Sequence, residues 1–526
     1  MINKVGRDIP EELLAHGAEV FQGQYWQDQK EYKKASPTVR AFVDPAQEKL
    51  VPTLQEAIVK SGLQDGMTVS FHHHFRDGDF VGNMVVEAIA SLGIKDITIC
   101  ASSLGDAHDP IVRYIENGVV TGISTSGVRG KIGETISRGK LKKVATLRSH
   151  GGRVRAIETG DIHIDVAFIG APSSDAYGNA RGKGGKSNCG VLSYSMVDAK
   201  YADKVVVITD SLVDFPNFPP SIQQVDVDYV VVVDKIGDPQ KIANSVLRVT
   251  DNPRDLIIAE TAAKVLVNTP YFKDGFSFQT GGGGSPLAVT RFVRPYMEEK
   301  NIQMGFALGG ITKPMLDLMN DGFIRTIVDA QDFDIPSIES VNSHSRHFEI
   351  SISQYANPFN KGAFVNKLDF VILGALEIDT AFNVNVVTGS DGILRGAPGG
   401  HVDAAAGAKC TIIVAPLIRN RIPTIRESVT TVTTPGESVD IFVSDMGVAI
   451  NPRRQDLIDG LRKTHLPIRT IEDMKAEAYS RVGVPAEIEF DEKVVAVVEY
   501  RDGTIIDVVK RKKDKPALHH VREVFL

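Results

Sequence analysis

The sequence predicts an α/β protein made of two tandem domains with mostly parallel sheets, related by internal duplication. Helical patterns alternate along the chain with short apolar runs such as MTVSF, DITICA, KVVVITD and VDYVVVV. Buried strands separated by helices of about 10–15 residues are typical of parallel sheets covered by helices. In addition, three blocks of sequence recur in the same order at nearly one offset.

The recurring blocks match at polar and glycine positions. DGMTVSFHHHFRDGDF begins at Asp65, and DGFSFQTGGGGSPL begins at Asp274, 209 residues later. IDVAFIGAPSSDAYGNARG and LDFVILGALEIDTAFNVNV match at four positions, each pair 204 residues apart: Asp165 and Asp369, Gly170 and Gly374, Asp175 and Asp379, and Asn179 and Asn383. Asp228 and Asp440 open a third pair, 212 residues apart. Such self-similarity predicts two copies of one unit, at residues 46–250 and 251–485.

The two ends of the chain differ from the repeated units. Residues 1–45 are polar and read as an arm that holds the only tryptophan, with a short helix expected over residues 11–21. Residues 486–526 contain two alternating runs joined at Asp502-Gly503, which predicts a small β-hairpin cap. The last, basic residues read as a solvated tail.

The composition indicates a soluble, cytoplasmic protein. The apolar fraction of 42% and the charged fraction of 24% are ordinary for a globular protein, and a net charge of −7 favours no polyanion partner. Three widely spaced cysteines fit a reducing compartment. The sequence predicts no signal peptide, no membrane span and no metal site.

The segment GFSFQTGGGGSPL contains four consecutive glycines, which are typical either of a linker or of a backbone cradle for an anion. The run follows a strand-like FSFQ and opens a helical pattern, with Pro286 at the favoured start of a helix. This placement favours a cradle in which Gly281, Gly282 and Gly283 present backbone amides to an anion or a developing oxyanion. The spacing matches neither a dinucleotide fingerprint nor a P-loop.

A second glycine-rich turn, SDGILRGAPGGHVDAAAGAK, places Gly399 and Gly400 before another run of small residues. Two such turns in one repeat suggest a site that holds an extended ligand and stabilises negative charge. The first copy has a weaker version, NARGKGGKSNCG, with two lysines.

The first copy carries SFHHHFRDGDF where the second carries its glycines. On a strand His72 and His74 share one face and His73 the other, so a metal ion would need a third ligand from elsewhere. One interpretation is a set of polar residues at the end of a strand. The other combines the histidines with Arg76 in a cationic pocket for carboxylates. RSHGGRVR (148–155) either adds charge to that pocket or forms a solvated loop.

Four segments carry a resemblance to a known family: VSFHHHFRDGDFVGN, FQTGGGGSPLAVTRF, LGALEIDTAFNVNV and GAPGGHVDAAAGAK. Together they resemble the coenzyme A transferase superfamily and, within it, the family of citrate lyase α subunits. The chain also has no nucleophile motif such as G-x-S-x-G. The resemblance implies two coenzyme A transferase domains that face each other across an active-site cleft. It implies an exchange in which an acetyl thioester and citrate give a citryl thioester and acetate.

The resemblance also implies the partners. The thiol would belong to a dephospho-coenzyme-A-derived prosthetic group on a separate acyl carrier subunit, with acetyl-CoA as a surrogate and no cofactor bound covalently to this chain. A lyase subunit would cleave the citryl thioester. The chain would form a homo-oligomer within a large cytoplasmic complex.

One departure from the superfamily concerns the covalent route. The position of the superfamily's catalytic glutamate falls near Ala307, where no acid is present. This favours a direct reaction of both substrates, with Glu377 as a positioning residue, or alternatively a nucleophile. The expected catalytic residues are Gly281, Gly282, Gly283, Glu377, Gly399 and Gly400. The expected substrate-binding residues are His72, His73, His74, Arg76, Ser102, Ser103 and Asn383.

Two other classes of function stay open at this point. The chain could be a non-catalytic scaffold that docks the carrier and lyase subunits. It could also be an acyl-CoA hydrolase or a transferase for another acid.

Overall fold

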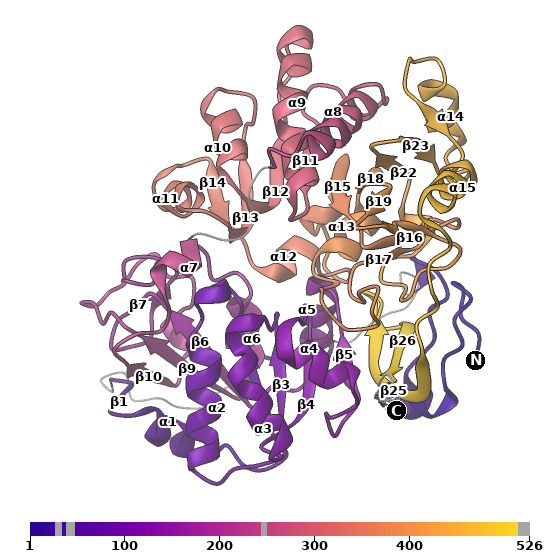
Figure 1. The fold of residues 1–526 in the computed structure, drawn as a ribbon. Helices are drawn as coiled ribbons and strands as arrows, with labels where there is room; N and C mark the ends of the chain where they lie inside the picture. Colours follow the sequence, from indigo (N-terminus) through magenta and orange to yellow (C-terminus); the bar gives the residue numbers. More distant parts are fainter. Residues whose placement is uncertain (27–33, 38–47, 244–249, 514–526) are drawn as a thin grey trace, which may run out of the picture.

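The computed structural model describes residues 1–26, 34–37, 48–243 and 250–513. The first half of the chain (indigo to magenta in Figure 1) and the second half (pink to orange) each build one large sheet covered by helices. The expected boundary at residue 250 adjoins the undescribed residues 244–249, so the domain limits stay a prediction. The expected basic tail at residues 514–526 also lies outside the described residues.

The first sheet has ten strands in the order β1-β10-β9-β6-β2-β3-β4-β5-β25-β26. All neighbours are parallel except the final pair, β25 and β26. The runs expected as strands form β2, β3, β6, β9 and β10, which are mostly buried, as parallel strands covered on both faces should be. The strands are β1 (Leu50–Val51), β2 (Thr68–Phe71), β3 (Ile97–Ala101), β4 (Val120–Thr125), β5 (Ala145–Leu147), β6 (Val166–Ala171), β9 (Lys204–Thr209), β10 (Tyr229–Val232), β25 (Phe490–Glu499) and β26 (Ile505–Lys512). The helices of this half are α1 (Leu54–Ser61), α2 (Val81–Ser91), α3 (Val112–Glu116), α4 (Gly130–Ser137), α5 (His150–Thr159), α6 (Ser195–Tyr201) and α7 (Pro239–Ala243).

The second sheet has nine strands in the order β14-β13-β12-β11-β15-β18-β22-β23-β24, and only β22 and β23 pair antiparallel. These are β11 (Ser277–Thr280), β12 (Phe306–Ile311), β13 (Ile327–Asp332), β14 (His347–Glu349), β15 (Phe370–Gly374), β18 (Cys410–Val414), β22 (Ile441–Ser444), β23 (Gly447–Ile450) and β24 (Ile468–Arg469). The helices are α8 (Pro253–Val267), α9 (Gly284–Lys300), α10 (Lys313–Asn320), α11 (Ile335–Ser343), α12 (Ile352–Ala356), α13 (His401–Gly407), α14 (Gln455–Leu461) and α15 (Ile471–Val482).

The two sheets share one strand order. The first runs β10-β9-β6-β2-β3-β4-β5 and the second runs β22-β18-β15-β11-β12-β13-β14, and both place their seven strands in the chain order 7-6-5-1-2-3-4. The shared order supports the duplication that the sequence predicts.

The matched aspartates of the repeat are structural. Four of them accept a hydrogen bond from a backbone amide at the start of a neighbouring strand. The pairs are Asp165 with Thr68, Asp228 with Val205, Asp369 with Ser277, and Asp440 with Thr411. Each carboxylate thereby satisfies an amide at the edge where parallel strands begin. These repeated aspartates therefore mark the starts of the strands and not the position of a functional site.

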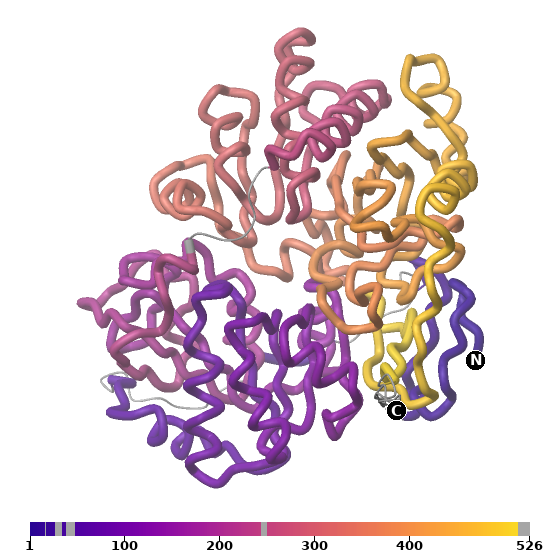
Figure 2. The backbone as a smooth tube through the Cα atoms, viewed as in Figure 1, coloured from indigo at the N-terminus to yellow at the C-terminus, as the bar shows by residue number. Residues whose placement is uncertain are grey.

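The ends of the chain meet beside the first sheet. β25 pairs with β5, so the hairpin that the sequence predicts extends the ten-stranded sheet instead of covering the molecule as a cap. Val20 of the N-terminal segment pairs with Ile505, and Phe21 packs edge-on against Tyr500. Figure 2 shows the indigo N-terminal tube alongside the yellow hairpin.

Two expected helices differ in detail. The run KLVPTLQEAIVKSG begins with strand β1, because Pro52 separates it from α1, which starts after the cap Thr53. Residues 11–17 form a 3₁₀ helix, and the following residues turn to extended backbone. No helix among the described residues is both long enough and apolar enough to cross a membrane.

Candidate active site

A cleft of about 690 Å³ lies where the carboxyl ends of the two parallel sheets face each other. The first half contributes Arg129, His150 and Tyr194. The second half contributes most of the wall, including residues 279–286, 309–310, 373–376 and 397–401 together with Gln331, Phe333, Tyr355, Arg254 and Arg419. Ligands of α/β sheets bind at this edge because strand-to-helix turns meet there. A separate cavity of about 480 Å³, beside the N-terminal segment and Arg501, contains none of the expected site residues.

The four glycines of residues 281–284 line this cleft and do not link two domains. Gly281 donates its amide to the Ile372 carbonyl at 2.7 Å, so this amide is already used. Among the hydrogen bonds of the described residues, the amides of Gly282 and Gly283 are donors in none. Gly283 has φ 132°, a backbone conformation that glycine adopts without strain, and it precedes the 17-residue helix α9. The free amides and the helix N-terminus together favour negative charge.

The second glycine turn connects the two halves. Gly399 donates to the Ser126 carbonyl at 3.0 Å and accepts from the amide of His150 at 2.8 Å, so its backbone is used by the fold. Gly400 donates to no acceptor among the described residues. A Cβ on Gly400 would lie 2.4 Å from the Tyr355 hydroxyl, so only glycine fits there. Of the predicted glycines, Gly282, Gly283 and Gly400 thus keep amides available to a ligand.

The three adjacent histidines separate in space. The rings of His72 and His74 stack with centroids 6.1 Å apart and point into the first half. His72 Nε2 lies 3.0 Å from the Asp198 carboxylate, and His74 Nε2 donates to the Gly170 carbonyl at 2.9 Å. Burial lowers the pKa of His74 to about 4. Neither ring lines the cleft, so the expected direct role of these two histidines in a substrate pocket is not what their contacts indicate.

His73 instead points across the boundary between the halves. Its Nδ1 lies 2.6 Å from the Ser102 hydroxyl, and its Nε2 lies 3.2 Å from Oε1 of Gln331 in the second half. Tyr194 donates to the same oxygen at 3.4 Å. Burial and the nearby His150 lower the pKa of His73 well below its usual value, so the ring is neutral and donates through Nε2. The amide nitrogen of Gln331 is buried and has no acceptor among the described residues, which leaves it available to a ligand.

Arg76 lies just behind the wall of the cleft. Its guanidinium covers the Phe333 ring at 3.9 Å, and its Nε and Nη2 have no hydrogen-bond partner among the described residues. Burial lowers the pKa of Arg76 to about 9, so it remains charged at neutral pH. Its φ of 53° is unusual for a non-glycine residue, and such strain clusters at functional sites.

The segment RSHGGRVR is neither a solvated loop nor a source of free charge. Arg148 binds Glu499 of the hairpin through both carboxylate oxygens, at 2.6 and 2.5 Å. Arg153 binds Asp198 in the same way, at 2.8 and 2.5 Å, and Arg155 pairs with Asp161. Only His150 lines the cleft. The buried arginines are thus compensated within the fold, as buried charges must be.

Two further expected residues are structural. The side-chain amide of Asn383 donates to the Asp379 carboxylate at 3.1 Å within a turn. In the first half, Asn179 makes the same bond to Asp175 at 2.8 Å. The position of Asn383 in the repeat therefore marks it as a turn residue. Ser103 donates weakly to the Gly127 carbonyl at 3.4 Å. Ser102 acts through His73.

Glu377 lies outside the cleft, in a smaller cavity of about 330 Å³. Its carboxylate accepts from the Asn385 amide at 2.9 Å and from the Thr430 backbone at 2.7 Å, and it lies 3.2 Å from the Arg426 guanidinium. A carboxylate that is held by three partners outside the cleft is poorly placed to attack a thioester bound in the cleft. Ala307, in the position of the superfamily's glutamate, is buried in β12.

Several cleft residues were not among the expected site residues, although His150 and His401 lie in segments that the sequence singles out. Gln331, Arg129 and His150 each follow or end a parallel strand, and this position was one available signal, because such ends meet at one edge of a sheet. Tyr194 and Tyr355 precede or lie in short helices and had no such signal. His401 lines the cleft as a neutral ring between the Thr434 hydroxyl and the Gly374 carbonyl, with its pKa lowered by burial to about 4.

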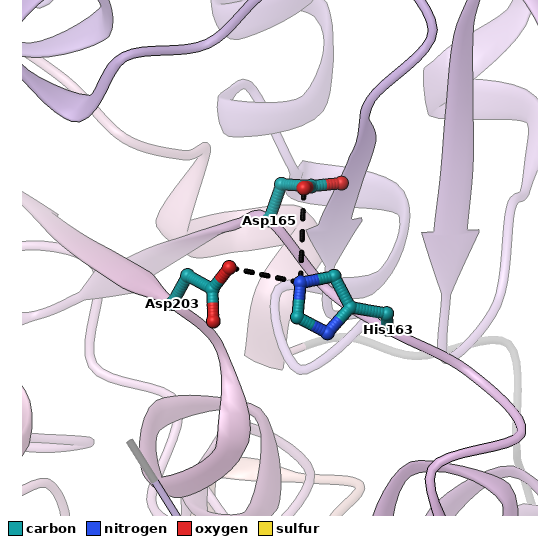
Figure 3. A group of neighbouring side chains, drawn as sticks. All are labelled: His163, Asp165 and Asp203. Atoms are coloured by element: carbon teal, nitrogen blue, oxygen red, sulfur yellow. Dashed lines mark hydrogen bonds and ion pairs between the residues drawn. The ribbon is translucent and has the colours of Figure 1, made fainter. Parts of the chain in front are cut away.

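Among the described residues, two groups of acidic and histidine side chains are close enough to hold a cation, and neither lies in the cleft. In Figure 3 the exposed His163 ring lies between two carboxylates, with Nε2 2.8 Å from Asp203 and 3.8 Å from Asp165. Asp369, which matches Asp165 in the repeat, pairs with Lys409 at 2.7 Å. The shared pattern indicates surface ion pairs at equivalent strand starts. The second group is the buried Asp329, Asp332 and His347.

The two facing parallel sheets place the protein in the coenzyme A transferase-like fold class. A malonate decarboxylase α subunit from Acinetobacter baumannii, 14% identical, shares this fold with a TM-score of 0.61, covering 83% of this chain and 88% of that one. Residues 47–512 match the family model of the citrate lyase α subunit. The chain belongs to the citrate lyase α-subunit family.

Individual relatives agree with this assignment. The citrate lyase α chain of Haemophilus influenzae is 56% identical over 466 residues, covering 89% of this chain and 93% of that protein. The Klebsiella pneumoniae protein is 52% identical over 479 residues, covering 91% and 94%. A crystal structure of the citrate lyase α subunit from Streptococcus mutans, in complex with citrate, is 53% identical, with a TM-score of 0.94 and coverage of 97% and 100%.

Proposed function

We propose that this chain exchanges acetyl for citryl on a carrier-protein thioester, so that an acetylated acyl carrier and citrate give the citrylated carrier and acetate. The observation that carries the proposal is the composition of one cleft. The free amides of Gly282, Gly283 and Gly400 lie in it together with the polar side chains of Gln331 and Tyr194. Relatives that are more than half identical are citrate lyase α chains, and the Streptococcus mutans structure contains citrate.

The charge of the cleft supports two anionic ligands. Among the described residues that line it, Arg129, Arg254 and Arg419 are cationic, and Asp255 is the one carboxylate. The lining histidines are neutral at pH 7, because burial lowers the pKa of His150 to about 3 and that of His401 to about 4. Guanidinium groups suit carboxylates and phosphates, since their planar fork matches both anions.

The reaction needs no protein nucleophile. A citrate carboxylate is ionised at neutral pH and can attack the acetyl thioester carbonyl directly. The carbon–sulfur bond breaks, the thiolate leaves, and a mixed acetyl-citryl anhydride forms. The thiolate then attacks the citryl carbonyl of the anhydride, and acetate departs. One thioester replaces another, so the exchange is close to thermoneutral.

The work of the protein is positioning and charge stabilisation. Holding two reactants in line supplies roughly 7–11 kcal/mol of the barrier, and one oxyanion donor supplies about 2.7–4 kcal/mol. In this proposal Gly282, Gly283 and Gly400 stabilise the tetrahedral oxyanions. Gln331, Tyr194 and Arg129 hold the other groups of citrate, with the charge of Arg76 behind Phe333.

The test is citrate-dependent acetate release. Purified chain is mixed with an acetylated acyl carrier, or with acetyl-CoA, in the presence and absence of citrate. Release that requires citrate supports the exchange, release without citrate indicates a hydrolase, and no release in either case favours a scaffold that docks the carrier and lyase subunits.

The direct route has its own test. The enzyme is incubated with acyl donor, treated with borohydride or hydroxylamine, and digested for mass spectrometry. We expect no labelled carboxylate. Labelling at Glu377 would replace the direct route with a covalent one.

A further inference from the structure

The solvent end of the cleft holds two arginines that have no carboxylate partner within 4 Å among the described residues. Arg254 is exposed and Arg419 is half-buried, whereas Tyr194 and Gln331, which line the same cleft, are buried. No ion pair within 4 Å involves either arginine among the described residues. The one carboxylate of the lining, Asp255, accepts a hydrogen bond from the Thr250 hydroxyl at 3.1 Å.

Each of the two guanidinium groups is fixed by a backbone carbonyl, and the carbonyl that holds Arg254 belongs to the residue before Arg419. Arg254 Nη1 donates to the Ile418 carbonyl at 3.0 Å, and Arg419 Nη2 donates to the Ala375 carbonyl at 3.1 Å. Each bond uses one N–H of a group that has five, so the other donors remain available. Burial and then the nearby charge of Arg254 lower the pKa of Arg419, whereas Asp255 raises it. An anion bound between the two arginines relieves the repulsion of their like charges.

The same end adjoins the glycine turn. A Cβ placed on Gly284, the first residue of α9, would lie 2.8 Å from the Cβ of Thr250. The segment that carries Arg254 therefore lies against the N-terminal turn of a 17-residue helix, whose partial positive charge adds to that of the arginines. The free amides of Gly282 and Gly283 line the same cleft as the two arginines.

We propose that Arg254 and Arg419 form a phosphate-binding site that holds the phosphate groups of the carrier arm of the acyl donor, an inference that rests on the proposed function. The arm enters from the solvent end, its phosphates bind the two arginines, and its thioester reaches the free glycine amides. Citrate occupies the opposite end of the cleft. The site thus selects a thioester on a phosphate-bearing arm over the same thioester on a neutral arm.

The experiment compares two donors that differ in their phosphates. Acetyl-dephospho-CoA carries a diphosphate, and acetyl-pantetheine carries none. The double variant Arg254→Gln/Arg419→Gln is expected to raise the KM for acetyl-dephospho-CoA by at least about tenfold. Its kinetics with acetyl-pantetheine and its KM for citrate should stay within about twofold of the wild type. Losses of equal size with both donors, or no loss with either, would overturn the site.

Arg421→Gln is the matched control. It removes the same charge from an exposed arginine two positions away, outside the cleft lining, and should behave as the wild type. Inorganic pyrophosphate is expected to compete with acetyl-dephospho-CoA in the wild type and in Arg421→Gln, but about tenfold more weakly in the double variant. Equal inhibition of all three proteins would also refute the site.

A binding measurement separates this inference from the proposed function. Calorimetric titration of dephospho-CoA needs no turnover, and the double variant should bind it at least about tenfold more weakly than the wild type. Citrate-dependent acetate release with unchanged dephospho-CoA binding in the double variant leaves the proposed function standing and rejects the phosphate site. Weakened binding without any acetate release in the wild type supports the site and rejects the exchange.

Discussion

Gly281 and Gly282 are neighbours in the chain, yet their backbone amides differ in hydrogen bonding. The Gly281 amide completes a bond to β15, and the exposed Gly282 amide has no acceptor among the described residues. In the same way, His73 reaches Gln331 while His72 and His74 point into the first half. The chemistry at this scale therefore depends on single residues within motifs that look uniform in the sequence.

Gly282→Val is expected to lower kcat by about 100-fold while the KM for citrate changes by less than about threefold. A branched side chain on the exposed backbone keeps the thioester oxygen away from the amides, and one oxyanion donor is worth about 10²–10³ in kcat. Steady-state kinetics with varied citrate give both constants. Gly460→Val, at an open position in α14, is the control and should be unaffected. Equal losses of kcat and citrate affinity would contradict the division of roles.

Arg76→Ala is expected to raise the KM for citrate by at least about tenfold. Nε and Nη2 of Arg76 have no hydrogen-bond partner among the described residues, so its charge can stabilise an anion bound beside it. Arg113→Ala removes another arginine that covers an aromatic ring, that of Tyr114 at 4.6 Å, and serves as the control. Citrate kinetics of both variants at pH 7 provide the measurement. An unchanged KM in Arg76→Ala would refute a role for Arg76 in holding citrate.

At the scale of elements, the C-terminal hairpin belongs to the first sheet. β25 continues the parallel pairing from β5, and Glu499 binds Arg148, which directly precedes the α5 segment that carries His150. Because β5 would otherwise be an edge strand, the hairpin covers an aggregation-prone edge as well as supporting the cleft.

Val498→Asp in β25 is therefore expected to destabilise the whole protein, by more than about 4 kcal/mol, because it buries an unpaired charge. Val498 is 1% exposed and pairs with Leu147, whereas Val484 is 76% exposed. Val484→Asp is the control and should unfold like the wild type. Urea unfolding followed by circular dichroism measures the difference. Unfolding of the Val498→Asp protein at wild-type urea concentrations would show that the hairpin is dispensable.

At the scale of the molecule, the two halves form one binding unit because loops of the second half dock on the first. The amide of Val128 donates to the Gly396 carbonyl at 3.0 Å, and Asp403 accepts from the Ser149 hydroxyl and the Gly151 amide, each at 2.8 Å. One apolar cluster includes core residues of both halves. Neither half would form the cleft alone.

The same close packing makes stability depend on pH. Burial lowers the pKa of His74, His347 and His401 to about 4, and that of His150 to about 3, so these rings are neutral in the fold and bind protons on unfolding. Their contribution is complete above pH 6.5 and is lost as the pH falls toward 4. Asp403, whose pKa burial raises to about 6, acts in the opposite sense, because its ionised form destabilises the fold as the pH rises.

His74→Gln should make stability less sensitive to acid. A folded pKa of about 4 and an unfolded value of 6.5 correspond to about 2 kcal/mol lost between pH 7 and pH 5. The glutamine amide can still donate to the Gly170 carbonyl, so the bond in the fold is retained. Urea midpoints at both pH values for wild type and variant give the change. An identical pH dependence of the two proteins would contradict the assignment.

Local features of the chain and contacts between distant residues differ in how far the sequence predicts them. The strands and the glycine turns follow from local periodicity, and the duplication follows from blocks that recur about 200 residues apart, so these features could be predicted. Gln331, Tyr194 and Arg129 could not, because nothing near them in the chain marks their meeting across the cleft. The contacts of Asn383 and Glu377 lie within the fold, because polar residues in a repeated motif also build turns and strand pairs.

By itself the sequence determined two parallel α/β units, a family resemblance and two glycine-rich turns at strand ends. Only the tertiary structure decided which amides remain free, which histidine and arginine face the second half, and that the hairpin completes the first sheet. The physical reason is that backbone conformation is set largely by neighbours in the chain. Whether an amide or a guanidinium is left without a partner depends on what the rest of the fold brings next to it.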